Sequence, residues 1–273
     1  MRVLIDGVET PAESAAVSVF DWAVQRGFGC FEVVRAYRGI PFHLGAHLDR
    51  LERSAGAIGL QLADRSRLES WAGAIAAAGG DCQVRVIVTG GGRDPTLEVP
   101  SRTIVTWEPL PEVPIPLRLM PLEAPWHPGQ ATGPFFGVKW LSYAPNMASG
   151  DLARAAGFDD ALLLSRDGSV IEGPTFTVAW VRGGTLETPT LDLGILASIT
   201  RQVVLEEARR LGIEVREGRY PLERMQSSDE AMGLSTLKEV LPIGAVGEAQ
   251  FESGPVTVAL QRAYADVVAA ETG

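Results

Sequence analysis

The stretch Gly137-Val138-Lys139-Trp140-Leu141-Ser142-Tyr143 contains one of only two lysines in a chain with 24 basic residues. The second lysine is Lys238, so the other 22 basic residues are arginines. Arginine serves wherever a positive charge alone is needed, whereas only a lysine amine forms an imine with an aldehyde. Each lysine is therefore a candidate for chemistry that arginine cannot do. Alternatively, both remain by chance on the surface, and composition alone does not decide.

Length and composition predict an ordinary soluble globular protein. Hydrophobic residues make up 46% and charged residues 21% of the 273 residues, which suits two small domains. No apolar run approaches the roughly 20 residues of a membrane span, and Asp6 interrupts the N-terminus before a signal segment could form. Cys30 and Cys82 provide no disulfide framework, so we expect a cytoplasmic protein. A net charge of −10 argues against nucleic-acid binding.

A proline-rich stretch divides the chain into two expected domains. Four prolines fall between Pro109 and Pro116, a density that excludes a helix or a central strand. We therefore expect a small N-terminal α/β domain at 1–110, a linker at 111–116 and a larger C-terminal α/β domain at 117–273 that contains Lys139. The fold class is α/β (α+β).

Periodicity indicates the main elements of each domain. Apolar and β-branched runs predict strands at 31–37, 84–88, 104–107 and 117–120. Helical spacing of apolar residues predicts one helix that ends at Gly59 and another that runs from Ile199 to Gly212. Arg166-Asp167-Gly168 is typical of a hairpin turn.

Three further segments acquire meaning beside the lysine segment. They are Val170-Ile171-Glu172-Gly173-Pro174-Thr175, the segment 194–201 that contains Ser198-Ile199-Thr200, and the segment 234–242 that contains Ser235-Thr236. In this order and spacing, the four segments resemble the class IV (fold type IV) pyridoxal-phosphate enzymes. That family includes D-amino-acid transaminases, branched-chain aminotransferases, R-selective amine transaminases and aminodeoxychorismate lyases. The resemblance covers nearly the whole chain and implies the two-domain fold type IV, with the active site between the domains.

The resemblance assigns the reactive groups. It implies that Lys139 forms the imine with pyridoxal 5′-phosphate and then moves the proton of the substrate α-carbon, and burial favours the neutral amine that both roles require. Glu172 is expected at the pyridine nitrogen, where a carboxylate keeps the ring protonated and thus an electron sink. Tyr143 is expected to donate a hydrogen bond to the cofactor's phenolic oxygen. A solvated hairpin end for Glu172 and a packing role for Tyr143 are the alternatives.

Phosphate binding is expected at the start of the predicted helix at Ile199. Free backbone N–H groups and the positive end of the helix dipole converge there. Ser198 caps this helix in any case. The resemblance implies a cofactor-binding role for a set of residues that lie outside the lysine and glutamate segments: Arg50, Leu196, Ser198, Ile199, Thr200, Ser235 and Thr236. Leu196 is expected against a face of the cofactor ring.

The member of the family is indicated by the segment Phe31-Glu32-Val33-Val34. Glu32 and the residues after it resemble D-amino-acid transaminases, whereas aminodeoxychorismate lyases often carry threonine at that position. Phe31, Glu32 and Thr175 are expected on the substrate side. The arginine-x-histidine carboxylate trap of some D-amino-acid transaminases is missing after Thr89, so Arg26 and Arg93 are alternative carboxylate anchors.

We therefore predict a transaminase that moves an amino group from a D-amino acid, and also from R-amines, to a 2-keto acid. An aminodeoxychorismate lyase and a branched-chain L-amino-acid aminotransferase remain as alternatives. The resemblance also implies a homodimer in which each active site uses residues of the neighbouring subunit. His43, His47 and His127 have no metal-ligand spacing, so we expect structural or exposed histidines and no metal.

Overall fold

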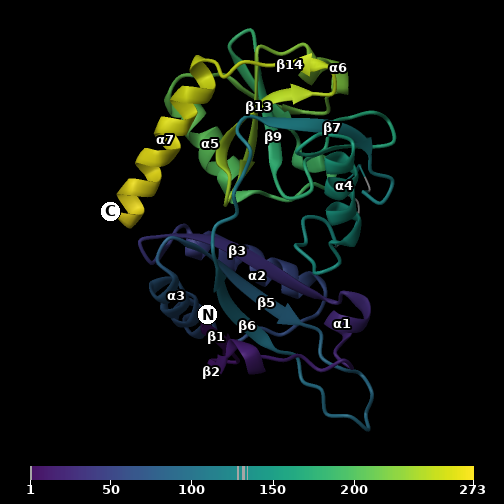
Figure 1. Cartoon of the computed structure of the whole chain (residues 1–273), viewed down its shortest axis with the longest axis vertical. Helices are drawn as coiled ribbons and strands as arrows, with labels where there is room; N and C mark the ends of the chain where they lie inside the picture. The colour runs from purple at the N-terminus through teal and green to yellow at the C-terminus, as the bar shows by residue number, and fades with distance from the viewer. Residues whose placement is uncertain (1, 128, 131–132, 134) are drawn as a thin grey trace. The chain divides into compact units, whose positions relative to one another are not determined.

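The computed structural model describes residues 2–127, 129–130, 133 and 135–273. The chain divides into two units (Figure 1). The first unit comprises Met1–Pro111, Val138–Tyr143 and Glu271–Gly273, and the second comprises Glu112–Gly137 and Ala144–Ala270. The first crossing between the units, after Pro111, coincides with the start of the predicted linker.

The first unit is built on a six-stranded sheet with the order β2-β1-β6-β5-β3-β4 among the described residues, and every pair in it is antiparallel. Its strands are β1 (Arg2–Ile5), β2 (Val8–Pro11), β3 (Gly29–Tyr37), β4 (Ile40–Pro41), β5 (Cys82–Thr89) and β6 (Thr103–Glu108). The helices are α1 (Trp22–Arg26), α2 (Leu44–Ala57) and α3 (Arg65–Gly79). The strands predicted at 31–37, 84–88 and 104–107 lie within β3, β5 and β6, which confirms them.

One hydrophobic core joins the sheet of the first unit to α2 and α3. Strand β5 presents Val84, Val86 and Val88 to it, and α2 contributes Leu48 and Leu51. The two-residue alternation along β5 places these valines on one face of the sheet. The turns of α2 place its leucines on the face that packs against this core. Helix α2 ends at Ala57, two residues before the predicted stop at Gly59, whose φ is +70°.

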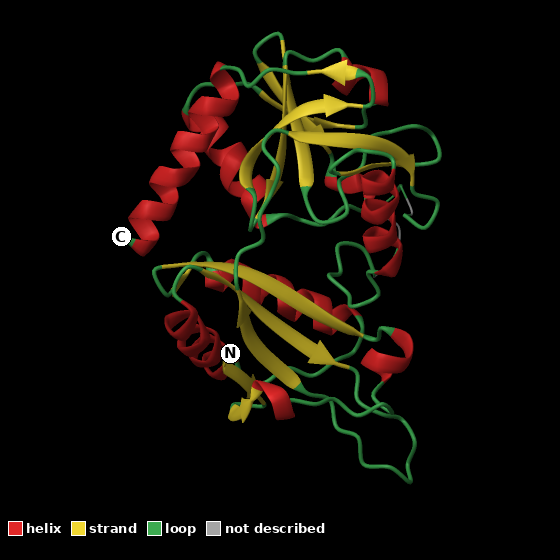
Figure 2. Cartoon of the chain, in the orientation of Figure 1, coloured by secondary structure: helices red, strands yellow, loops and turns green. Residues whose placement is uncertain are grey.

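The described residues of the second unit form an eight-stranded mixed sheet (Figure 2). Seven strands follow the order β11-β10-β9-β12-β13-β7-β8, and the eighth, β14, pairs with β13. Its strands are β7 (Leu117–Glu123), β8 (Asp160–Leu164), β9 (Thr177–Arg182), β10 (Thr185–Pro189), β11 (Val215–Gly218), β12 (Glu230–Ser235), β13 (Glu239–Val246) and β14 (Ala249–Gln250). The helices are α4 (Ala144–Ala155), α5 (Ile199–Arg210), α6 (Leu222–Gln226) and α7 (Pro255–Thr272). The predicted helix from Ile199 is α5, and the predicted strand 117–120 lies in β7.

The predicted turn at Arg166-Asp167-Gly168 is present after β8. The amide of Ser165 donates to the carbonyl of Ser169 at 2.9 Å, and Gly168 has a φ of +79°. This left-handed conformation strains any residue with a Cβ, which explains the glycine. The returning chain then pairs with β8, because the amide of Leu163 donates to the carbonyl of Glu172 at 2.9 Å.

The lysine segment lies in the first unit, although the sequence had placed Lys139 in the C-terminal domain. Backbone pairing explains the difference. Phe31 donates its amide to the carbonyl of Lys139 at 3.0 Å, and Leu141 donates to the carbonyl of Gly29 at 3.0 Å. The segment therefore extends the edge of β3. Sequence distance alone did not reveal this pairing.

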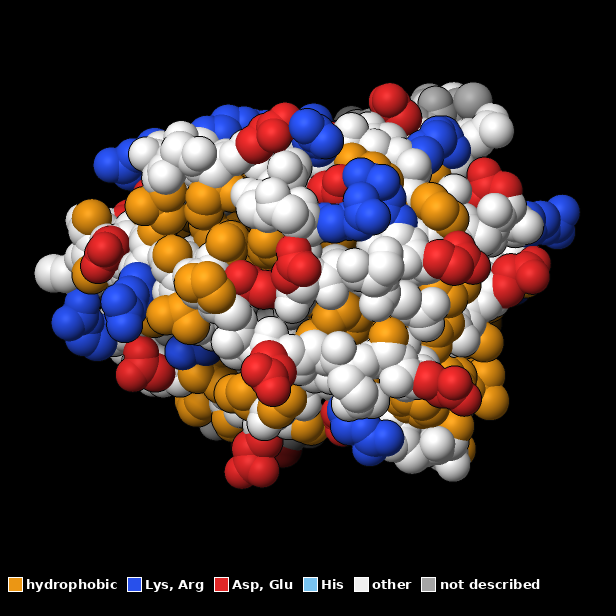
Figure 3. Space-filling view, turned by 90° about the horizontal axis from the view of Figure 1, so that it is seen from above, with side chains coloured by type: hydrophobic (Ala, Val, Ile, Leu, Met, Phe, Trp, Pro, Cys, Tyr) orange, Lys and Arg blue, Asp and Glu red, His pale blue; other side chains and the backbone are white. Residues whose placement is uncertain are grey.

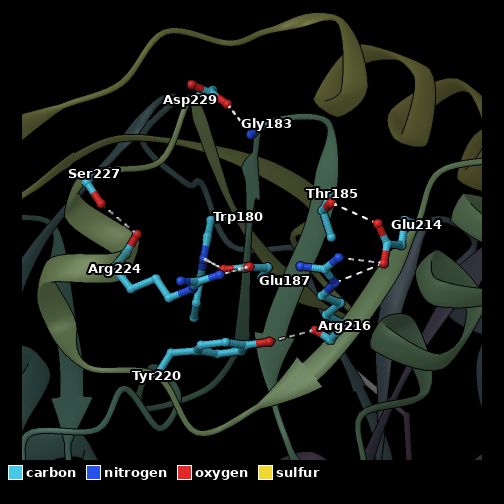
Figure 4. A network of polar contacts seen from close by, with 10 residues as sticks. All are labelled: Trp180, Gly183, Thr185, Glu187, Glu214, Arg216, Tyr220, Arg224, Ser227 and Asp229. Carbon is cyan, nitrogen blue, oxygen red and sulfur yellow. Dashed lines mark hydrogen bonds and ion pairs between the residues drawn. The ribbon is translucent and has the colours of Figure 1, made fainter.

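A buried polar network ties β10 to α6 in the second unit (Figure 4). Glu187 accepts hydrogen bonds from Trp180 Nε1 at 2.9 Å and from Arg224 Nε and Nη2 at 2.9 and 2.6 Å. Tyr220 contacts Trp180 edge-to-face, and Arg224 lies over the Tyr220 ring. Every oxygen of this buried carboxylate has a donor, as burial requires.

The surface is mixed in charge. On the face shown in Figure 3, basic and acidic side chains are interspersed with hydrophobic ones. Across the described part of the chain, no helix is both long and apolar enough to cross a membrane.

Candidate active site

The backbone of Lys139 is held by two elements of the first unit. Besides its pairing with β3, its amide donates to Ser54 Oγ of α2 at 3.2 Å. Cys30 and Trp140 form an antiparallel bridge. A Cβ at Gly29 would lie 2.5 Å from the Val88 carbonyl oxygen and 2.5 Å from the Leu141 side chain, so glycine is needed where β3 packs between β5 and the lysine segment.

The side chain of Lys139 lies beside two aromatic rings. Its Nζ is 4.7 Å from the centroid of Phe31 and 5.5 Å from that of Tyr143. The two rings contact each other edge-to-face with centroids 5.4 Å apart. The structure thus brings together three residues that the sequence had assigned to the site. Ring faces attract the ammonium form of lysine and shield its stem from water.

Glu32 occupies the opposite face of β3 from Phe31. Successive side chains of a strand point to opposite faces, and Glu32 shares its face with the buried core residues Cys30 and Val34. Its carboxylate is 0% exposed. Arg50 donates to it from Nε and Nη2, both at 2.7 Å, and His47 Nδ1 lies 2.8 Å away. The expectation that Glu32 contacts substrate therefore differs from the structure, in which both of its oxygens face α2.

Burial and pairing shift the pKa values of the network formed by Glu32, His47 and Arg50. Burial by itself would raise the pKa of Glu32, but the charge and hydrogen bonds of Arg50, with help from His47, lower that pKa to about 2. Burial lowers the pKa of His47; Glu32 opposes this, while the charges of Arg50 and Lys139 add to it. His47 is therefore neutral at pH 7 and donates its Nδ1 proton to Glu32. Burial and the neighbouring Glu32 raise the pKa of the Cys30 thiol to about 12, which leaves it unreactive.

Arg50 is buried although the helical pattern places it off the apolar stripe of α2. His47 and Arg50 are three residues apart and so lie on the same side of α2. Glu32 stands at a position of β3 where the alternation of side chains predicts an apolar residue. That signal could have revealed this network, because a buried carboxylate needs cationic or hydrogen-bonding partners. His47 was predicted to be structural or exposed, and its side chain is buried.

In the second unit, Glu172 lies beside a histidine. Its Oε1 is 3.7 Å from His127 Nε2, and both side chains are largely buried. Helix α4 and strand β8 separate His127 from Glu172 along the chain, so no periodic pattern could connect the two. His127 was predicted to be structural or exposed, and its pairing with Glu172 was not predicted. The carboxylate of Glu172 keeps a small exposed fraction through which a basic ring nitrogen could approach.

The start of α5 presents free backbone donors. Ser198 is the N-cap, and its Oγ accepts the amide of Arg201 at 3.2 Å. The amides of Ile199 and Thr200, at the first two helical positions, have no partner within the helix. Arg201 is buried and donates to the carbonyl of Pro189 at 2.9 Å and to Glu217 at 2.7 Å. These bonds anchor the helix start to β10 and β11, and a helix start of this kind offers amides suited to an anion.

The remaining predicted residues lie at the ends of elements. Leu196 is half-buried just before α5, and Ser235 and Thr236 lie where β12 turns into β13. Ser235 Oγ accepts the amide of Lys238 at 3.2 Å, which orders this turn. Thr175 is exposed just before β9.

The two candidate carboxylate anchors differ in their surroundings. Arg26 is exposed at the end of α1 and donates to the carbonyl of Gln25 at 3.1 Å. Arg93 is also exposed, but its guanidinium lies 4.8 Å from the Trp22 ring and 5.6 Å from the Phe28 ring. Stacking on two rings restricts the guanidinium of Arg93, whereas among the described residues Arg26 has only the local contact with Gln25.

The profile of the amino-transferase class IV family matches residues 29–246. This chain belongs to the class IV aminotransferases.

The proteins to which this chain is similar are named as enzymes that act on different substrates. The chain is 29% identical to the aminodeoxychorismate lyase of Bacillus subtilis over 96% of its own length and 93% of the relative's. It is 29% identical to a D-alanine aminotransferase of Listeria monocytogenes over 100% of its length and 98% of the relative's. The solved branched-chain aminotransferase of Thermoproteus uzoniensis matches with a TM-score of 0.89 at 27% identity, over 99% of this chain and 95% of that one.

Class IV aminotransferases depend on pyridoxal 5′-phosphate, and the residues of this class IV aminotransferase fit that group. Lys139 offers an amine, and Glu172 offers a carboxylate suited to a ring nitrogen. The start of α5 offers amides suited to a phosphate. Among the described residues, no group of three or more His, Cys, Asp or Glu side chains could hold a metal ion.

Proposed function

We propose that this class IV aminotransferase transfers the amino group of a D-amino acid to a 2-keto acid, with R-amines as secondary donors. The buried Glu32, held by Arg50 through two hydrogen bonds of 2.7 Å, carries the proposal. The segment around Glu32 resembles D-amino-acid transaminases, and aminodeoxychorismate lyases often carry threonine there. A threonine cannot form this bidentate pair, so the surroundings of position 32 suit a glutamate side chain, as in the transaminases that the segment resembles. The relatives named as D-alanine aminotransferases are consistent with this choice.

The proposed roles of the side chains follow from their chemistry. Bound pyridoxal phosphate supplies an aldehyde that condenses with amines and a protonated ring that withdraws electrons. Lys139 Nζ holds the cofactor and takes the proton from the substrate α-carbon, a role that requires a neutral amine. Glu172 accepts a hydrogen bond from the protonated ring nitrogen. Tyr143 donates a hydrogen bond from its hydroxyl to the cofactor's phenolic oxygen. Ile199 and Thr200 bind phosphate through their amides, together with Ser198, Ser235, Thr236 and Arg50, and Leu196 packs on the ring.

Carboxylate recognition is proposed for Arg26 or Arg93 in the first unit, with Phe31 and Thr175 lining the substrate. The stacking of Arg93 on Trp22 and Phe28 favours it, because a pre-oriented guanidinium loses less entropy when it binds a carboxylate. Removal of the anchor should weaken reaction with D-amino acids far more than with R-amines, which lack the carboxylate.

A half-reaction panel tests the substrate class. The purified holoenzyme is mixed with D-amino acids, L-amino acids or R-amines, and the conversion of the cofactor spectrum to its amine form is followed. We expect conversion with D-alanine or D-glutamate, slower conversion with R-amines, and return of the original spectrum when a 2-keto acid is added. Rapid conversion by L-leucine with none by D-alanine or D-glutamate would replace the proposal with a branched-chain enzyme. Release of pyruvate from aminodeoxychorismate without a keto acid would replace it with a lyase.

We also propose that the protein works as a homodimer, as the family resemblance implies. Sedimentation of the holoenzyme at the concentration of the assay should give the mass of two chains. A fully active species with the mass of one chain would contradict this assembly.

A further inference from the structure

The second lysine lies in the turn between β12 and β13, beside residues of the β8 region. Its side chain is only 14% exposed. Lys238 Nζ is 3.5 Å from Asp160 Oδ2, 3.5 Å from Thr175 Oγ1 and 4.1 Å from the centroid of the Phe176 ring. Few lysines are buried to this degree without a function or a close ion pair. Lys238 is thus not a surface residue retained by chance.

Strand register explains why these residues meet. Leu234 of β12 pairs with Thr177 of β9, so the chain before β9 and the turn after β12 emerge at the same edge of the sheet. That edge therefore holds Thr175 and Lys238 together. Asp160 is the first residue of β8, and its Oδ2 reaches to within 3.5 Å of Lys238 Nζ.

The contacts of the ammonium group are long. Within the described residues, its two polar neighbours are both 3.5 Å away, beyond the 2.7–3.2 Å typical of an N–H···O hydrogen bond. An ammonium has three protons to donate. Two donors 3.5 Å apart can, however, both reach one oxygen atom placed about 2.8 Å from each. The Nζ of Lys238 and the hydroxyl of Thr175 have that separation, and Thr175 is exposed.

The charge of this pair suits an anionic oxygen. Burial lowers the pKa of Lys238, and the nearby charge of Arg154 adds to this, whereas Asp160 opposes it and favours the ammonium form. Because the Asp160 contact is loose, the positive charge is only partly compensated. A carboxylate would satisfy the ammonium and would gain more there than in water.

We propose that Lys238 and Thr175 together bind one carboxylate oxygen of the amino-acid substrate, which makes Lys238 a specificity-determining residue. The inference rests on the proposed transaminase function, because it assigns the pair to the same substrate. It adds a cation in the second unit to the arginines considered in the first. Thr175 follows Glu172 by three residues, and Lys238 follows Thr236 by two, so the pair adjoins two of the segments assigned to the cofactor.

A matched pair of amino donors isolates the carboxylate. D-alanine and (R)-1-phenylethylamine differ in one substituent at the reacting carbon, a carboxylate in the first and a phenyl ring in the second. Half-reaction rates are measured against donor concentration for the wild type, Lys238→Met, Thr175→Val and the double variant. Arg166→Met, which removes an exposed cation from a turn of the same unit, is the control. The cofactor spectrum and melting temperature of each variant verify that it folds and holds the cofactor.

We expect Lys238→Met to lower kcat/KM for D-alanine by roughly 10- to 100-fold, mainly through KM, because a hydrogen bond to a charged group is lost. Reaction with the amine should stay unchanged. Thr175→Val should lower the D-alanine value by roughly 2- to 10-fold, as for a weaker donor. The double variant should lose less than the product of the two single effects, since both donors serve one oxygen. Arg166→Met should behave as the wild type.

Equal losses for both donors in Lys238→Met, or an unchanged D-alanine value, would overturn the inference. Thr175 is exposed, so Thr175→Val tests the pair even if the lysine variant does not fold, and an unchanged D-alanine value there would also count against it. A wild type that uses only L-amino acids would refute the proposed function instead. The same variants would then be compared on L-leucine and 3-methylbutylamine, and a selective loss with L-leucine would support the carboxylate site.

Discussion

Each unit contains a buried glutamate that is held by an arginine and by a ring nitrogen, but the residues around the two pairs differ. Glu32 is held by Arg50 and His47 between β3 and α2, and Glu187 is held by Arg224 and Trp180 between β10 and α6. Both carboxylates are at most 1% exposed. Arg50 is almost as buried as its partner, whereas the Arg224 side chain is 34% exposed. A bidentate buried pair is therefore common to both regions and by itself does not mark a functional site.

The difference lies in what surrounds each pair. In the Glu32 network, the charge of Lys139 lowers the pKa of His47. This network also contains Arg50, which we propose as a phosphate ligand. The Glu187 network contains none of the proposed site residues. Burial of a charge costs free energy that pairing only partly returns. We infer that the first network orders the cofactor site and that the second only holds α6 on the sheet.

The largest effect is expected at Lys139, which adjoins only the first network. Lys139→Ala and Lys139→Arg should each lower turnover by roughly 10³-fold or more, because the arginine keeps the charge but neither forms an imine nor accepts the proton. Steady-state turnover and the visible absorbance that borohydride abolishes are the measurements. Arg166→Met, which alters an exposed cation outside the proposed site, is the control. Ordinary turnover in Lys139→Arg would remove Lys139 from its role.

Glu32→Gln and Glu187→Gln separate stability from function. Breaking a buried ion pair costs roughly 3–5 kcal/mol, so Glu32→Gln should lower the free energy of unfolding by about that amount in a urea titration, and Glu187→Gln should lower it in the same direction. Only Glu32→Gln should also slow turnover of the folded, cofactor-saturated protein. Glu214→Gln, in an exposed pair with Arg216, should change neither quantity. A similar loss of turnover in Glu187→Gln would show that the two networks do not differ in function.

Arg50→Ala and Arg224→Ala compare the two arginines directly. Loss of one hydrogen bond to a charged group costs on the order of 1.5–3 kcal/mol, so Arg50→Ala should weaken pyridoxal-phosphate binding by roughly 10- to 150-fold. Arg224→Ala should leave it unchanged. Equilibrium dialysis against the cofactor measures both affinities. An unchanged affinity in Arg50→Ala would mean that Arg50 serves only Glu32.

The smallest effect is a pH dependence that only the first network should show. The pKa of His47 lies below its ordinary value of 6.5 in the folded protein, so below pH 6.5 the unfolded chain binds more protons and stability falls as the pH falls. The slope approaches about 1.4 kcal/mol per pH unit for one proton. His47→Gln should remove this slope between pH 6.5 and 4.5, as measured by urea unfolding across that range.

Below pH 4.5 both networks should lose stability, which provides an internal control. Folding lowers the pKa of Glu32 to about 2 and also lowers that of Glu187. Each therefore stabilises the protein above the ordinary value of 4.5 and loses that contribution as the pH falls toward its folded pKa. Persistence of the full slope between pH 6.5 and 4.5 in His47→Gln would assign it to another group.

Periodicity and turn chemistry were enough to predict much of the fold. The alternation of Val84, Val86 and Val88, the spacing of apolar residues after Ile199 and the prolines before Leu117 each depend on local preferences that the structure confirms. The order of the four segments predicted the family, which the match over residues 29–246 confirms. Lys139, Ser198 and Thr200 were assigned to the site in the same way, because motif spacing and helix caps are visible along the chain, and these assignments stay predictions.

Contacts between distant segments could not be predicted from these patterns. The sequence by itself determined the fold class and the family and singled out the lysine as a candidate, since these depend on near neighbours and on residue chemistry. Tertiary structure decided that the Lys139 segment pairs with β3, that Glu32 faces α2 and that Lys238 reaches Thr175 and Asp160. Each of these depends on strand register and on which face of an element is covered. Register brings together residues far apart in the chain, and a shift of one residue would turn every side chain of a strand to the other face.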